Sequence, residues 1–122
     1  MRIFVFCSNR EGRHGAGAAK DALEQHGAIY GQAEGLQGQS YAIVTKELRD
    51  GYLPVKLFEI ACGILRFLVF AAGHPEHEFD VTAIGCGLAG FSAKQIAPFF
   101  AGATANVYLP HQFLRFLPKE AT

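Results

Sequence analysis

The stretch Arg13-His14-Gly15-Ala16-Gly17-Ala18-Ala19-Lys20 decides the fold. It follows an apolar run of β-forming residues at 2–7 and a polar turn, and it leads directly into a helical pattern that ends near residue 26. The order of strand, glycine-rich turn and helix predicts unhindered backbone N–H groups at the first turn of a helix. Because these groups lack partners within the helix and carry the positive end of its dipole, we expect them to favour an anion.

A second glycine cluster, Ile84-Gly85-Cys86-Gly87-Leu88-Ala89-Gly90, occurs in a similar context. It follows an alternating segment typical of a strand, and Ser92 behind it is a suitable N-cap for another helix. Successive N–H groups in such a loop form a concave nest for anions. We expect the two glycine loops to meet over a phosphate-bearing ligand.

The rest of the chain alternates between strand-like and helix-like segments. This alternation predicts one α/β domain over residues 1–122, with a mostly parallel sheet and helices on both faces. In such sheets ligands bind outside the carboxyl ends of the strands, which is where both glycine loops and Lys46 fall. We expect strands at 2–7, 40–45, 78–84 and 105–109, and helices at 15–25, 54–72 and 93–100.

Two further segments carry specific predictions. Residues 28–39 have no clear period and are predicted to be a long surface loop. Pro54 fits the first turn of the long helix, because its missing N–H costs nothing there. The helical spacing predicts a stripe that faces the core, formed by Leu57, Ile60, Ala61, Ile64, Leu65, Leu68 and Val69.

Composition excludes several classes of protein. Half of the 122 residues are hydrophobic and 18% are charged, which argues against disorder. Eleven basic residues balance eleven acidic ones, so that a non-specific nucleic-acid binder is disfavoured. The apolar segment 53–73 is broken by Lys56, Glu59 and Arg66, which indicates a buried helix and no membrane span.

The three cysteines are few and widely spaced along the chain. No Cys-x-x-Cys pattern occurs, so reduced thiols in the cytoplasm fit better than a disulfide framework or a zinc site. Met1-Arg2 leads directly into the first strand, and we expect no signal peptide. His74 and His77 flank a proline that would break any helix aligning them, so that we read them as a polar connection and expect no metal.

Two side chains near the expected ligand have both a chemical and a plain interpretation. Lys46 ends a strand at the ligand edge, where an amine binds phosphate or attacks a sugar carbon if desolvation lowers its pKa. The plain alternative is a solvated lysine. Cys86 lies between two glycines and is either a nucleophile or a small buried residue that lets the loop fold.

Taken together, three motifs resemble a macrodomain. The likeness is to the branch with the terminal ADP-ribose protein glycohydrolase and the antitoxin macrodomains that remove ADP-ribose from DNA. It rests on the glycine stretch at 13–19, on Tyr41-Ala42-Ile43-Val44-Thr45-Lys46, and on the second glycine cluster. The order and spacing agree over residues 3–109. The resemblance implies a three-layer α/β/α macrodomain-like fold with a mostly parallel central sheet.

The resemblance also implies roles for individual residues. Lys46 would be the catalytic lysine that attacks the anomeric carbon and releases the modified side chain or base. Asn9 would lie near the distal ribose, and Gly15 and Gly17 would approach the ribose and diphosphate. His14 belongs to the same loop and joins the expected ligand contacts. The diphosphate would be wrapped by the second loop, through Gly85, Cys86, Gly87, Leu88, Ala89 and Gly90.

The expected activity is hydrolysis of ADP-ribosyl linkages to an acidic side chain or a nucleic-acid base, without a cofactor. The partners implied are ADP-ribose or a similar nucleotide, and ADP-ribosylated protein or DNA, but no membrane. Ala89 stands where the human-type enzyme has an aspartate, and no Gly-Asp phrase precedes the first strand. A non-catalytic reader or sponge of ADP-ribose-type nucleotides, including cyclic ones, is therefore the alternative. A third class is a structural protein whose glycine loops only pack. The compact chain also resembles small phage-encoded proteins.

Overall fold

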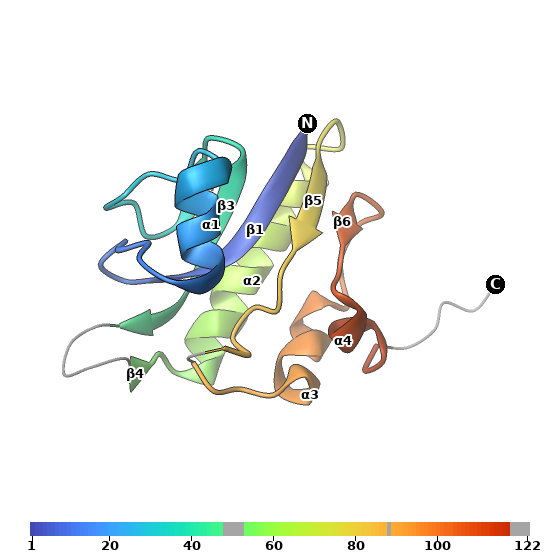
Figure 1. Ribbon diagram of the computed structural model, residues 1–122. Coiled ribbons are helices and arrows are strands. Elements are labelled where there is room, and N and C mark those ends of the chain that lie inside the picture. Colours follow the sequence, from blue (N-terminus) through green and yellow to red (C-terminus); the bar gives the residue numbers. More distant parts are fainter. Residues whose placement is uncertain (48–52, 88, 118–122) are drawn as a thin grey trace.

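The computed structural model describes residues 1–47, 53–87 and 89–117. Its centre is a sheet in the order β2-β3-β1-β5-β6 (Figure 1). β1 lies parallel to β3 on one side and to β5 on the other, and β5 lies parallel to β6. The strands of this order are β1 (Arg2–Asn9), β2 (Gly35–Gln37), β3 (Ser40–Glu47), β5 (Glu78–Val81) and β6 (Val107–Tyr108). The structure therefore confirms an α/β fold with a mostly parallel sheet.

Two helices cover opposite faces of this sheet, α1 (Gly17–Gln25) and α2 (Leu57–Ala72). Both faces need cover because successive side chains of a strand point to opposite faces of the sheet, and β1 has hydrophobic side chains on each. Ile3 and Val5 belong to the large core cluster that includes the buried side of α2, whereas Phe6 packs with Ala19 and Ala22 of α1. Figure 1 shows α1 in front of the sheet and α2 behind it.

The segment after β5 ends in short helical turns. Ser92 caps α3 (Ala93–Ile96) as predicted: its hydroxyl accepts a hydrogen bond from the N–H of Gln95, and the Oε1 of Gln95 accepts one from the N–H of Ser92. The helix then tightens into the 3-10 turn η1 (Ala97–Phe100), because Pro98 supplies no N–H. The last element, α4 (His111–Leu114), packs against α3.

Asn106 connects the end of α2 with the start of β5. Its Nδ2 donates to the carbonyl oxygens of Ala71, His74 and His77 at 2.9, 3.2 and 3.2 Å. The backbone N–H of Phe79 in turn donates to the carbonyl of Asn106. These bonds set the turn that the sequence places at Gly73, where α2 ends as expected.

Several expected elements differ from the observed ones. The predicted loop 28–39 contains β2 (Gly35–Gln37), which pairs antiparallel with β3. Pro54 does not begin the long helix; it lies in β4 (Leu53–Pro54), opposite Lys46, and α2 starts at Leu57. The strand predicted at 78–84 ends at Val81 and the one at 105–109 is reduced to β6, because irregular turns replace their ends.

The inward stripe predicted for α2 is wrong at two positions. Leu65 and Val69 are 56% and 75% exposed, and the buried side is formed by other residues. Those residues are Ile60, Gly63, Ile64, Phe67, Leu68 and Ala71. α2 is apolar on both sides, so the spacing of its hydrophobic residues could not tell which side faces the sheet.

Two properties of the described part of the chain bear on function. None of its helices has the length and apolar character that crossing a bilayer requires. Within the same residues no group of three or more His, Cys, Asp or Glu side chains is arranged to hold a metal ion.

Candidate functional site

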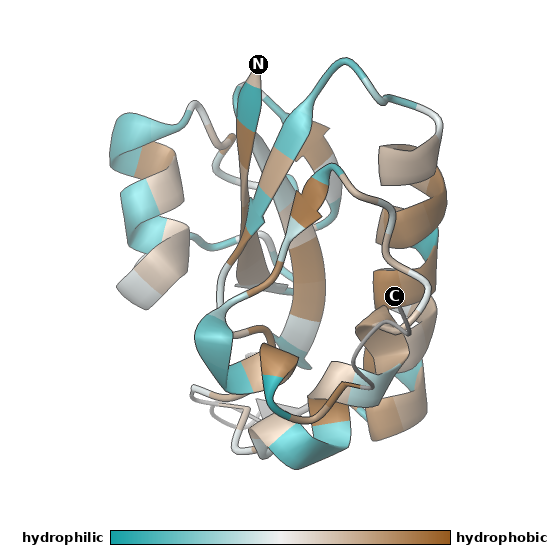
Figure 2. Ribbon diagram, turned by 90° about the vertical axis from the view of Figure 1, so that its right-hand side faces the viewer, coloured by the Kyte–Doolittle hydropathy of each residue, from teal (hydrophilic) through white to brown (hydrophobic). Residues whose placement is uncertain are grey.

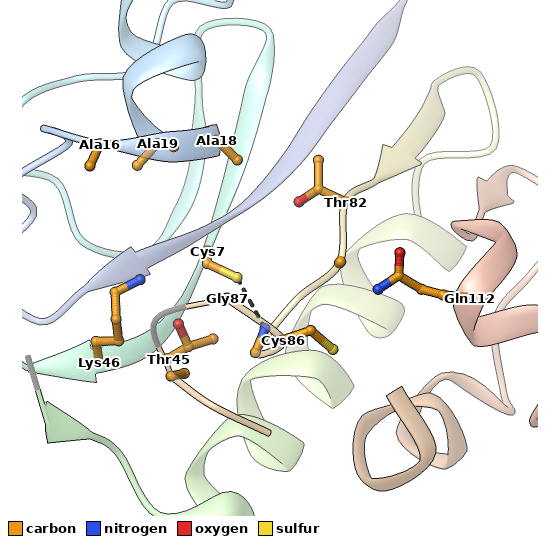
Figure 3. Close-up of a pocket in the computed structure, with 14 residues that line it drawn as sticks. Cys7, Ala16, Ala18, Ala19, Thr45, Lys46, Thr82, Cys86, Gly87 and Gln112 are labelled. Carbon is orange, nitrogen blue, oxygen red and sulfur yellow. Dashed lines mark hydrogen bonds between the residues drawn. The ribbon is translucent and has the colours of Figure 1, made fainter. Parts of the chain in front are cut away.

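A cavity of about 360 Å³ opens at the carboxyl ends of β1, β3 and β5. Its size is within the range of small-molecule sites. Figure 3 shows how the labelled side chains surround it. The lining comes from the strand ends, the first turn of α1, the loop after β5, and α4: Cys7, Ala16, Gly17, Ala18, Ala19, Thr45, Lys46, Thr82, Ala83, Gly85, Cys86, Gly87, Ala89 and Gln112.

One wall is the N-terminus of α1. Ala16 is the N-cap and offers no side-chain hydrogen bond, and the first turn holds no acidic residue. Ala18 and Ala19 add only methyl groups (Figure 3). The first N–H groups of the helix are therefore neither capped by a side chain nor covered by a large one, and this suits a negatively charged ligand.

The opposite wall is the end of β3, where Thr45 and Lys46 line the cavity. Thr45 is fully buried, and its Oγ1 has no hydrogen-bond partner among the described residues. An unpaired buried hydroxyl costs free energy that a bound polar ligand would recover. Lys46 is half-buried and forms no ion pair with another described residue. It is also the one cation in the described lining.

The third wall is the loop after β5, and a hydrogen bond fixes its start. The N–H of Gly85 donates to the Sγ of Cys7 at 3.1 Å. Gly85 has a φ of +78°, in the left-handed region, and a Cβ added there would lie 3.0 Å from Cδ1 of Ile96. Only glycine fits this turn. At Gly87, by contrast, an added Cβ meets nothing within 4 Å, because the loop borders open space.

Both thiols in the cavity stay protonated at neutral pH. Burial raises the pKa of the Cys7 thiol, an effect that the Gly85 N–H, the charge of Lys46 and nearby Thr45 only partly offset. Thr45 lies close to this sulfur but without hydrogen-bonding geometry. Burial also raises the pKa of Cys86, and the neighbouring Cys7 adds to the rise. A protonated thiol is a poor nucleophile, so the raised pKa favours the plain interpretation of Cys86.

The structure brings most of the sequence-predicted residues together. Six of them line the cavity: Gly17, Lys46, Gly85, Cys86, Gly87 and Ala89. Asn9 and Gly15 line a small adjoining hollow of about 30 Å³ that also touches Lys46. Asn9 is buried there, and its side chain is held by hydrogen bonds to the backbone of Arg13.

Two predicted residues lie elsewhere. His14 is buried between Phe6 and the 32–37 segment, with its Nε2 3.1 Å from the oxygens of Gln32 and Gln37, and it is absent from the cavity lining. Because both neighbours are acceptors, this nitrogen donates and the ring anchors the loop. Gly90 is exposed and does not line the cavity. Leu88 lies outside the described residues.

Several residues of the lining were not predicted as ligand contacts, among them Cys7, Thr45, Thr82 and Gln112. Cys7 and Thr82 lie at the ends of the two parallel strands β1 and β5, so their positions alone could have indicated the site. Gln112 belongs to α4, a helix of four residues in a segment without a clear pattern. Only the tertiary fold brings its amide to the cavity (Figure 3).

A second cavity, also of about 360 Å³, lies beside the start of α2. Two ion pairs line it, Arg10 with Glu59 and Arg66 with Glu34. Each cation already has a carboxylate partner, so the cavity offers no unpaired charge of either sign from these four residues. The first cavity is therefore the better candidate for an anionic ligand.

Comparisons with known proteins give information on the fold but none on the activity. No family model matches the chain, and no curated protein matches it. A solved structure of a protein of unknown function from Bacteroides thetaiotaomicron is similar, with a TM-score of 0.54 and 14% identity over 89% of this chain and 87% of the other. At that identity the similarity shows a shared fold alone.

Proposed function

We propose that the protein binds ADP-ribose or a related NAD-derived nucleotide in the cavity at the carboxyl ends of β1, β3 and β5. The observation that carries this proposal is the pairing of the uncapped α1 N-terminus with the unpartnered Thr45 hydroxyl and Lys46 across one cavity. A diphosphate would accept from the α1 N–H groups and the 85–87 loop. A ribose would then extend toward Thr45 and Lys46.

We further propose that Lys46 acts on the sugar. Its neutral amine would attack the anomeric carbon C1″ while the bond from C1″ to the modified carboxylate or base breaks, and the leaving group departs with the bonding electrons. Water would then release the sugar and restore the amine. The place of Lys46 in the cavity lining, at the end of β3, supports this role, because it puts the amine where the ribose would extend.

A non-catalytic reader of the same nucleotides is a second candidate, and one observation favours it. No carboxylate or imidazole is among the described residues that line the cavity, and Ala89 offers no acid-base group. Hydrolysis usually employs such a group to move protons. Binding without turnover would identify the protein as a reader.

The layers of the fold support the proposed macrodomain resemblance. Helices on both faces of a mostly parallel sheet, with the glycine loops at one edge, are what a three-layer macrodomain-like protein would present. We also propose a reducing compartment, the cytoplasm, because Cys7, Cys62 and Cys86 are all free thiols.

The decisive experiment for catalysis compares wild-type protein with Lys46→Ala on protein ADP-ribosylated at acidic side chains and on ADP-ribosylated DNA. Release of ADP-ribose would be followed by chromatography. We expect the variant to lose at least about a hundredfold in rate, because the proposed nucleophile is gone. Lys94→Ala, which removes an exposed lysine on α3 outside the cavity, is the matched control. Equal rates for wild type and Lys46→Ala would overturn the lysine mechanism.

A further inference from the structure

The outer side of α2 is apolar, although it faces away from the sheet. Phe58, Leu65 and Val69 are 65%, 56% and 75% exposed, and Cys62 between them is also exposed. In Figure 2 this helix is coloured brown over much of its length, because hydrophobic residues predominate in it. We call these four residues the α2 stripe. A helix on the surface of a monomer normally turns charged residues outward, and one that is apolar all round is normally buried.

The spacing of the α2 stripe is that of a helix-pairing seam. Its members follow one another at intervals of four, three and four residues, the pattern by which one helix packs along another. The stripe runs through most of a 16-residue helix, a length of about 24 Å. A single exposed side chain would need no explanation, but a continuous row at this spacing does.

We propose that the α2 stripe pairs with the α2 stripe of a second copy of this chain, with the two helices antiparallel about a twofold axis. In this register Phe58 packs against Val69 of the partner subunit, and Cys62 packs against Leu65 of the partner subunit. The twofold axis repeats both contacts, so every member of the stripe meets an apolar partner. Isologous pairing of this kind is the commonest arrangement in homo-oligomers.

The charged residues beside the α2 stripe favour a second copy of this chain as the partner and an antiparallel direction for the two helices. Glu59 and Arg66 flank the stripe on one side, where each already pairs within its own chain, Glu59 with Arg10 and Arg66 with Glu34. Antiparallel pairing brings Glu59 alongside Arg66 of the partner subunit, and the twofold axis creates the same attraction again. Parallel pairing would offer no such match, because Ala61 and Leu68 occupy the other flank.

Sedimentation equilibrium over a wide range of protein concentration tests the dimer. A single helix pair is a small interface, so we expect a weak dimer that forms in the micromolar range. Val69→Glu should raise the dissociation constant at least about tenfold, because two carboxylates would enter the apolar seam. Leu114→Glu is the control. Leu114 is an apolar residue of α4 that is 51% exposed, which is similar to Leu65, and its replacement should leave the dimer intact. A strictly monomeric wild type would overturn the proposal, as would equal weakening by both variants.

Cross-linking tests the register. Leu65→Cys places a second thiol opposite Cys62 of the partner subunit, so mild oxidation should give a covalent dimer on a non-reducing gel. Wild-type protein should cross-link far less, because antiparallel helices offset the two Cys62 side chains. Efficient dimer formation by wild type alone would indicate parallel pairing, and no cross-link in either protein would contradict the seam. Circular dichroism confirms that each variant is folded.

Discussion

The sulfur of Cys7 accepts a hydrogen bond from the backbone N–H of Gly85, at 3.1 Å, and so joins the end of β1 to the loop after β5. These two residues are 78 positions apart in the sequence. The bond fixes the start of the loop that forms one wall of the cavity. The shape of the candidate site therefore depends on a thiol that has no assigned role in chemistry.

Cys7→Ala should loosen this wall. The Gly85 N–H would lose its acceptor, which costs about 1 kcal/mol in free energy of unfolding. Cys7→Ser supplies an oxygen acceptor in a similar place and should restore much of the loss. Urea denaturation of the two variants and wild type measures the difference. If Cys7→Ala were as stable as Cys7→Ser, the hydrogen bond would contribute nothing.

The protein should lose stability in alkaline solution. Burial raises the pKa of Cys7, Cys86 and Tyr41 in the folded chain, with Glu34 adding to the rise at Tyr41. Above about pH 8.5 the unfolded thiols release protons that the folded chain retains, so that the free energy of unfolding falls as pH rises. Below that pH the contribution is fully present. Urea unfolding of reduced protein between pH 7 and 10 measures the slope.

The matched variant for this pH dependence is Cys7→Ser, which keeps the side-chain shape but removes the ionisable thiol. Its free energy of unfolding should fall less steeply above about pH 8.5 than that of wild type. Identical slopes for the two proteins would show that Cys7 ionises as easily in the folded chain as in the unfolded one.

Gly87→Val should abolish nucleotide binding and leave the fold intact. A Cβ at Gly87 meets no atom within 4 Å in the protein, so the larger side chain would occupy space at the cavity that the ligand needs. Gly102→Val is the control, since its added Cβ is equally free of contacts but lies outside the cavity lining. Thermal unfolding and calorimetry with ADP-ribose separate the two effects. Retained affinity in a folded Gly87→Val protein would contradict the proposed diphosphate cradle.

Asn106→Asp should be strongly destabilising. The Asn106 amide donates toward three carbonyl oxygens, whereas a carboxylate would place negative charge against all three. We expect a loss of about 1–3 kcal/mol in free energy of unfolding. Thr104→Ala, which removes an exposed hydroxyl that donates to the same side chain together with the neighbouring methyl group, should cost much less. Equal losses would show that the three backbone acceptors are not what holds Asn106.

The sequence predicted the parallel strands and the edge of the sheet where the cavity lies, because buried strands and glycine loops leave local patterns. It did not predict β2, whose three residues show no alternation. That strand is held by tertiary contacts, among them the buried Gln37 side chain, which accepts from the N–H of Ile29 and lies 3.1 Å from Nε2 of His14. The same contacts explain why His14 anchors a loop and does not line the cavity.

The two errors around α2 also have physical causes. Pro54 suits the first turn of a helix, but it equally suits an edge strand, and its pairing with Lys46 decides between them. Leu65 and Val69 fit the predicted core stripe because they are apolar and correctly spaced. Gly63 is on the buried side instead, where an added Cβ would lie 3.3 Å from Cγ2 of Ile43, so the helix packs closely along a side with a weaker hydrophobic signal.

Calorimetric titration of ADP-ribose into wild-type protein and into Thr45→Val tests whether the cavity binds this nucleotide. We expect saturable binding at one site by wild type. We also expect clearly weaker binding by Thr45→Val, which keeps the shape of the buried side chain but removes the unpartnered hydroxyl. Absence of saturable heat from folded wild-type protein at millimolar ADP-ribose would contradict the proposed site.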